Sequence, residues 1–123
     1  MYTDMKPKYK KHIFICVNER DETNPKGDCT RCGGMDIRMK FVQLINQHGL
    51  KGKIRANKSG CLDACEMGPT LVIYPNNIWY THVSVDDVEE IFETSVINDS
   101  VVERLVSTEE TWEKLQEIRQ HNL

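Results

Sequence analysis

The segment from Thr70 to Val96 constrains the fold more than any other part of the sequence. Two apolar runs, "TLVIY" and "IWYTHV", flank the turn "PNN", and asparagine tolerates the positive φ that a tight hairpin requires. The next residues, "SVDDVEEIFETSV", predict an amphipathic helix that begins with a capping box formed by Ser84 and Asp87. The segment therefore predicts a β-hairpin followed by a well-marked helix.

The apolar pattern predicts the other elements in order. The run "HIFICV", residues 12–17, is typical of a buried strand, and a weaker strand signal is centred on Ile54. Between them a helix is expected from Asp36, ending at Gly49, and Ser107 or Thr108 caps a last helix over residues 109–120. The helical face before Gly49 consists of Ile37, Phe41, Leu44 and Ile45. This order predicts an α/β fold, a mixed β-sheet flanked by helices, with a C-terminal helical extension.

Length and charge limit the class of protein. A chain of 123 residues suits one domain, which we place at 12–106, between a basic N-terminal tail (1–11) and a C-terminal helix (107–123). The net charge of -3 argues against a nucleic-acid or anionic-membrane partner. No apolar run approaches the roughly 18 residues of a membrane span, and none resembles a secretory signal. We expect a cytoplasmic protein.

Five cysteines are unexpected in such a chain. An odd number in a reducing compartment weakens a disulfide framework, so metal binding or thiol chemistry is favoured. Cys16, on a predicted strand, fits an ordinary buried thiol. The other four lie in loops rich in glycine and polar residues, where burial gives no reason for cysteine.

Three chemistries use these cysteines differently. Cys29-x-x-Cys32 before a helix suits a thioredoxin-type thiol oxidoreductase, although Cys61 and Cys65 are then idle. Cys29, Cys32, Cys61 and Cys65 would suit a structural zinc site. An iron-sulfur cluster also needs four thiolates, for which Cys16, Cys29, Cys61 and Cys65 are one set. Spacing alone does not separate the two metals.

Two longer stretches resemble the thioredoxin-like [2Fe-2S] ferredoxins. In "HIFICVNERDETNPKGDC" twelve residues separate Cys16 from Cys29, and "SGCLDACEMGPTLVIYPNNIWYTHVSVDDVEEIFE" carries Cys-x3-Cys-x-x-Gly-Pro and Tyr-Pro. With "VVERL", the resemblance runs from about His12 to Leu105. The related subunit of respiratory NADH dehydrogenases has a shorter first spacing, so the chain is similar to the free ferredoxins.

The resemblance implies a thioredoxin-like fold and a [2Fe-2S] cluster with Cys16, Cys29, Cys61 and Cys65 as ligands. It implies a one-electron carrier rather than an enzyme, which exchanges electrons with redox enzymes and forms a homodimer. Cys32 departs from the family pattern as a spare thiol, and keeps the thiol oxidoreductase and zinc alternatives open.

Other polar residues have simpler interpretations. The acidic residues between Asp86 and Glu93 are expected to form a solvated helix face, with steering of a basic redox partner as the alternative. His48, in a last helical turn, and His82, on a strand, are expected to be structural rather than ligands.

Overall fold

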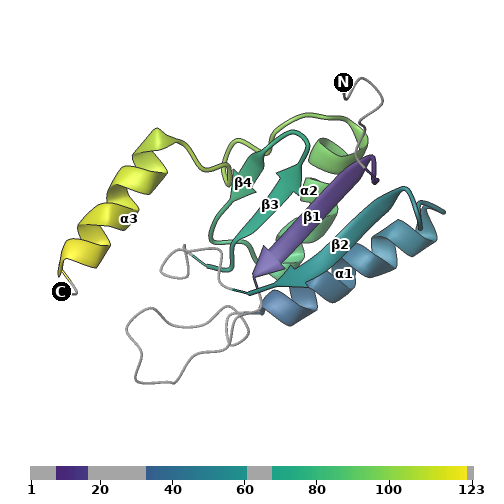
Figure 1. Cartoon of the computed structure of the whole chain (residues 1–123), viewed down its shortest axis with the longest axis horizontal. Coiled ribbons are helices and arrows are strands. Elements are labelled where there is room, and N and C mark those ends of the chain that lie inside the picture. Colours follow the sequence, from purple (N-terminus) through teal and green to yellow (C-terminus); the bar gives the residue numbers. More distant parts are fainter. Residues whose placement is uncertain (1–7, 17–32, 61–67, 122–123) are drawn as a thin grey trace, which may run out of the picture.

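A computed structural model of the chain describes residues 8–16, 33–60 and 68–121. Its sheet has four strands, β1 (Lys11–Cys16), β2 (Ile54–Ser59), β3 (Leu71–Tyr74) and β4 (Ile78–Tyr80), in the order β2-β1-β3-β4 (Figure 1). β1 is parallel to β2 and antiparallel to β3, and β3 is antiparallel to β4. The predicted mixed sheet is therefore confirmed.

Two helices cover one face of this sheet. α1 (Gly34–Gln47) packs on β1 and β2, and α2 (Val88–Ile91) packs beside α1 (Figure 1). Alternate strand residues point to the same face, so Ile13, Ile15, Leu71 and Ile73 meet the helices and are fully buried. The helices contribute Ile37, Phe41, Leu44, Ile45, Val88, Ile91 and Phe92 to the same core. Among the described residues, no helix covers the other face of the sheet in this way.

α1 begins two residues before the predicted Asp36. Gly33 precedes it with φ 101°, in the left-handed region that glycine reaches without strain, and this places Gly34 in the first turn. The predicted end is confirmed, because Gly49 has φ 66° and the Leu50 N–H donates to the Ile45 carbonyl at 2.9 Å.

The hairpin forms as predicted, with Asn77 at φ 58° in the turn between β3 and β4. The Gly68–Pro69 and Tyr74–Pro75 peptide bonds are cis. β4 ends at Tyr80, earlier than the predicted Val83, because His82 has φ 55° and cannot continue a strand. The later chain then lies along this edge: Val106 pairs with Tyr80, and the Ser107 N–H donates to the Trp79 carbonyl at 2.7 Å.

The helix after the hairpin is less regular than predicted. It begins with a 3₁₀ turn, η2 (Val85–Asp87), continues as α2, and ends as a π-helical turn, η3 (Phe92–Ile97). The predicted apolar stripe is nevertheless buried at Val88, Ile91, Phe92 and Val96. A π turn widens the helix without moving this stripe off the core, so the sequence pattern does not reveal it.

The capping box at Ser84 and Asp87 is confirmed. The Ser84 N–H and hydroxyl donate to the Asp87 carboxylate at 2.9 and 3.0 Å, and Arg104 donates to the same group at 2.8 Å. Burial would raise the pKa of Asp87, but the hydrogen bonds from Ser84 and Arg104 hold this pKa below its usual value. Asp87 is therefore charged throughout the neutral range.

Replacing Asp87 by alanine should lower the free energy of unfolding by about 1 kcal/mol, the usual worth of a helix cap. Because the folded-state pKa is depressed, the contribution of Asp87 is complete above its unfolded pKa of about 3.9 and is lost only as pH falls through the lower folded value. Thermal unfolding followed by circular dichroism should give the same difference at mildly acidic and mildly alkaline pH. Asp86→Ala, an exposed change in the same turn, is the control; an equal loss there would contradict the capping role.

Lys11 differs from its expected place in a basic tail. β1 begins at this residue, which is 5 % exposed, and its Nζ donates to Asn76 Oδ1 at 2.5 Å and pairs with Asp99. Asp99, in turn, has φ 57°, and its pKa is lowered by the hydrogen bond from Lys11. The ammonium group thus ties the start of β1 to the hairpin turn and to the chain after η3.

The C-terminal helix is confirmed as α3 (Glu109–His121). It lies at the β4 side of the molecule (Figure 1). The Trp112 and Trp79 rings meet there edge to face, with centroids 5.6 Å apart. Leu115 is 4 % exposed and packs with Trp112. Within the described part of the chain, no helix has the length and apolar character needed to cross a membrane.

Candidate metal centre

Cys16 is the predicted ligand that the structure describes. It is the last residue of β1, is 1 % exposed, and lies opposite Ser59 of β2. Its backbone N–H donates to the Thr70 carbonyl at 3.1 Å, on the other side of β1. Cys16 is thus held between two neighbouring chain segments at one end of the sheet.

The cysteine-bearing loops join the described chain at this same end. β2 runs parallel to β1 and finishes opposite Cys16, so Gly60, which precedes residues 61–67, lies at this edge. β3 runs the opposite way, so Pro69 and Thr70, which follow those residues, lie there as well. Residues 17–32 leave directly from Cys16 and lead to Gly33 at the start of α1.

Cys29, Cys32, Cys61 and Cys65 lie outside the described residues. Among the residues that are described, no three His, Cys, Asp or Glu side chains come together as a metal site. The structure therefore places Cys16 and the ends of both loops, and the full ligand set stays a prediction.

The chemistry of this edge suits a thiolate ligand. The β1 backbone fixes the direction of the Cys16 side chain, and its burial keeps water from competing for the sulfur. Thr70 is a residue that sequence reasoning missed: it is 1 % exposed, and its carbonyl anchors the Cys16 backbone. Its position directly after the Gly-Pro pair was the available signal.

His48 has the structural role that was expected, and the predicted position of His82 needs a correction. His48 follows α1, its Nδ1 lies 2.9 Å from the Leu44 carbonyl, and its ring packs 4.9 Å from that of Phe92. His82 was predicted to lie on a strand, and this is wrong: it follows β4 and is exposed.

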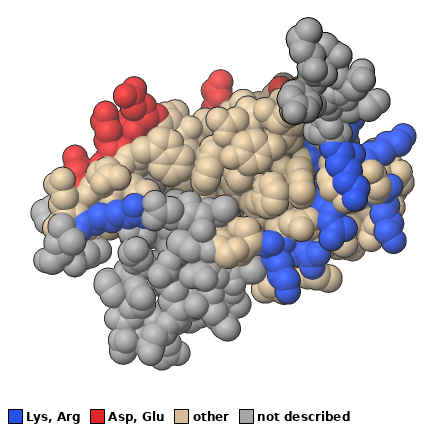
Figure 2. Space-filling model, in the orientation of Figure 1, with Lys and Arg blue, Asp and Glu red and all other residues tan. Residues whose placement is uncertain are grey.

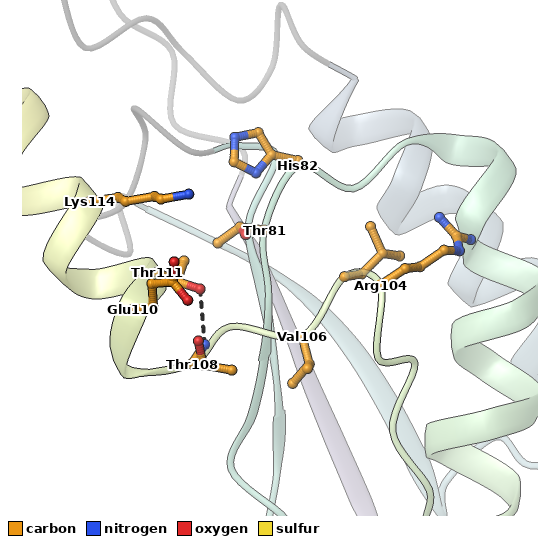
Figure 3. A pocket seen from close by; sticks show the side chains of 9 residues that line it. Thr81, His82, Arg104, Val106, Thr108, Glu110, Thr111 and Lys114 are labelled. Carbon is orange, nitrogen blue, oxygen red and sulfur yellow. Dashed lines mark hydrogen bonds between the residues drawn. The ribbon is translucent and has the colours of Figure 1, made fainter.

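His82 lines a shallow pocket between the end of β4 and α3, which Figure 3 shows with Lys114 reaching in from α3. Thr81, Thr108 and Thr111 add hydroxyl groups, and the Thr108 N–H donates to Thr111 Oγ1 at 3.0 Å. Arg104 borders the pocket (Figure 3). Its guanidinium is engaged by Asp87 and Glu90. The pocket contains one acid, Glu110, beside Lys114, and this mixture selects no particular ligand.

The acidic residues after Ser84 divide into two groups. Asp87 and Glu90 pair with Arg104 and so hold the start of this helix against the later chain. Asp86, Glu89 and Glu93 are exposed, as predicted for a solvated helix face.

The comparisons with known proteins identify the family. No family model matches the chain. The chain is 36 % identical over 96 residues to a protein from Clostridium pasteurianum named "Ferredoxin, 2Fe-2S", a match that covers 78 % of this chain and 94 % of that protein. It is 37 % identical over 97 residues to the protein of the same name from Aquifex aeolicus, with 78 % and 87 % covered. The chain belongs to the thioredoxin-like [2Fe-2S] ferredoxin family.

The three-dimensional likeness agrees with this. The crystal structure of the wild-type thioredoxin-like [2Fe-2S] ferredoxin from Aquifex aeolicus superposes with a TM-score of 0.77 at 35 % identity. The match covers 82 % of this ferredoxin and 99 % of the Aquifex chain, so roughly a fifth of this chain has no counterpart there. The predicted family and thioredoxin-like fold are confirmed.

Proposed function

We propose that this ferredoxin is a one-electron carrier that holds a [2Fe-2S] cluster on Cys16, Cys29, Cys61 and Cys65. The observation that carries the proposal is the position of Cys16, buried at the sheet edge where both cysteine-bearing loops begin and end. Four sulfur ligands, from Cys16 and from loops that join the described chain at one end of the sheet, can surround a single cluster. When bound, such a cluster takes up and returns one electron.

The protein residues would set how readily the electron is taken up. The strand pairing on both sides of Cys16 holds its sulfur in one orientation, so little rearrangement accompanies electron transfer. Backbone N–H groups near the sulfurs would stabilise the added charge. The net charge of -3 opposes the uptake of an electron and therefore favours a low reduction potential.

The proposal has further parts that follow the family. Residues 12–106 form the cluster-binding domain, and residues 107–123 are an appended helical segment. The carrier exchanges electrons with redox enzymes, performs no catalysis of its own, and forms a homodimer. It works in the cytoplasm, where a reducing environment keeps the five cysteines from forming disulfides, so that they stay available as ligands.

A reductive titration without oxygen tests this function. The visible absorbance should bleach on addition of about one electron per chain and return on reoxidation. In an insulin-disulfide assay the same protein should be inactive, because Cys29 and Cys32 do not act as a dithiol pair. Turnover that disappears in Cys32→Ala would instead indicate the thiol oxidoreductase.

A further inference from the structure

A pocket lies between α1 and β2, at the outer edge of the sheet. β2 is an outer strand in the order β2-β1-β3-β4, and α1 packs against it. The pocket has a volume of about 330 Å³, near the lower end of the range of small-molecule sites, roughly 300 to 1,000 Å³. Its β2 residues, 54–56, belong to the first half of the strand, whereas Cys16 lies opposite Ser59 at the end of the strand. The pocket is therefore separate from the proposed cluster site.

The base of this pocket is apolar. Ile45 of α1 and Ile54 of β2 are 4 % and 5 % exposed and belong to the main core. Val42, one turn before Ile45 on the same side of α1, is half-buried and packs against that core. Because these side chains are held by the core, the base is a preformed surface for an apolar group.

The rim of the pocket is positively charged. Arg38, Lys51 and Arg55 line the pocket, and no acidic residue of the described part of the chain does. Figure 2 shows lysines and arginines gathered at the end of the molecule where β1 and β2 begin. Among residues 8–16 and 33–60, Asp36 is the only acid. In a protein whose net charge is -3, such a local excess of cations favours an anionic ligand.

Neutral acceptors hold the two arginines in place. Arg38 Nε donates to the Ala56 carbonyl at 3.3 Å, and Arg55 Nε donates to Asn57 Oδ1 at 2.7 Å. Each contact uses one of the five N–H groups of a guanidinium, so the others are left for a carboxylate or phosphate. Neither arginine takes part in the ion pairs of Lys11 and Arg104. The positions of both groups are fixed while their charge stays uncompensated.

The open edge of β2 adds a backbone donor to this rim. The Ala56 carbonyl accepts from Arg38 and so points away from β1. The N–H and carbonyl of one strand residue point to the same side, so the Ala56 N–H also lies on the open edge. No group within the described part of the chain accepts from this N–H on that edge. An anion bound to Arg38 can therefore accept from Ala56 as well.

We propose that this pocket binds a small organic anion. The carboxylate or phosphate group of the ligand lies between Arg38, Lys51 and the Ala56 N–H, and its apolar part covers the base of the pocket. The cations select an oxyanion, and the apolar base selects one that is attached to a hydrocarbon or ring rather than a bare inorganic ion. This inference adds small-molecule binding to the proposed electron carrier and depends on neither the cluster nor the homodimer.

Amide chemical shifts of the oxidised, cluster-containing protein test the pocket in a nuclear magnetic resonance titration. Phenyl phosphate and phenylacetate carry the two kinds of anionic group on a ring, inorganic phosphate lacks the ring, and benzyl alcohol lacks the charge. Both aromatic anions should shift the amide signals of Asn46, Gly52 and Ala56 in a saturable way. The dissociation constant of inorganic phosphate should be at least roughly tenfold higher, and benzyl alcohol should not bind. The tighter of the two aromatic anions identifies the preferred group.

Two variants and a matched control decide whether the pocket itself binds the anion. Arg38→Gln should raise the dissociation constant of the tighter anion roughly tenfold, because it removes a charge-assisted hydrogen bond. Lys51→Gln, which leaves the contact between Arg38 and Ala56 in place, should act in the same direction. In Lys53→Gln the same charge is lost from an exposed residue at this end that does not line the pocket, so the change should be less than about twofold.

Three results would overturn the proposal: no saturable shift at these amides, inorganic phosphate that binds as tightly as the aromatic anions, or equal weakening by Lys53→Gln and the two pocket variants. The last result would indicate general attraction to the basic end of the molecule. Unchanged amide signals outside the pocket show that each variant is folded. The visible absorbance reports the cluster separately, so a failure of this proposal is distinct from a failure of the electron-carrier function.

Discussion

Cys16→Ala should abolish the visible absorbance of the protein and leave less than one iron per chain. Alanine offers no ligand atom, and Cys16 is held by strand pairing on both sides, so no neighbouring residue can move into its place. The substitution removes one buried sulfur at the edge of the sheet and leaves the main core between sheet and helices unchanged. The expected result is a folded, colourless protein, seen by metal analysis and far-ultraviolet circular dichroism.

Cys32→Ala is the matched control, since it removes a cysteine outside the proposed ligand set. It should keep the full iron content and spectrum. Cys29→Ala is expected to be partly rescued by Cys32, and the double variant Cys29→Ala/Cys32→Ala should lose the cluster. If Cys32→Ala lost the metal while Cys16→Ala kept it, a zinc site of Cys29, Cys32, Cys61 and Cys65 would be indicated instead.

Tyr80→Phe should lower the free energy of unfolding by about 2 kcal/mol, although it removes a single oxygen atom. Tyr80 and Ser95 are fully buried; the Tyr80 hydroxyl accepts from the Val102 N–H at 2.9 Å and lies 2.5 Å from Ser95 Oγ. Phenylalanine would leave both partners buried without a hydrogen bond. Because this hydroxyl joins β4 to η3 and to the chain before α3, its loss should loosen three segments together.

Urea unfolding of the cluster-containing protein without oxygen measures this effect, as a lower midpoint with an unchanged slope. Tyr74→Phe is the control, because Tyr74 belongs to the same sheet but is 40 % exposed, and removal of its hydroxyl should change stability by less than about 0.5 kcal/mol. Equal effects at the two positions would show that the buried hydrogen bonds do not stabilise the fold.

Elements with strong local signals could be predicted from the sequence. The hairpin, the capping box at Ser84 and the end of α1 at Gly49 were correct because each depends on a turn residue or on a periodic apolar pattern beside it. Features set by distant contacts were not predictable. Lys11 lies in a basic stretch that is typical of a tail, and the residues that hold it in place, Asn76 and Asp99, are far along the chain. The π-helical turn η3 leaves the apolar stripe unchanged, so the sequence pattern does not reveal it.

The candidate site was predictable in its chemistry more than in its geometry. Clustered cysteines in glycine-rich loops pointed to metal or thiol chemistry, and the family resemblance, which the relatives confirm, selected one of the alternatives. The position of Cys16 at the end of β1, between β2 and the residue before β3, depends on strand order and register. The spacing of the cysteines in the sequence does not reveal either. Thr70 escaped notice for the same reason: its role is a backbone contact across strands.

The most direct test is a determination of iron, acid-labile sulfide and zinc in protein purified without oxygen, together with its visible spectrum. We expect a red-brown protein with about two irons and two sulfides per chain and no stoichiometric zinc. A colourless protein that contains one zinc per chain would contradict this expectation.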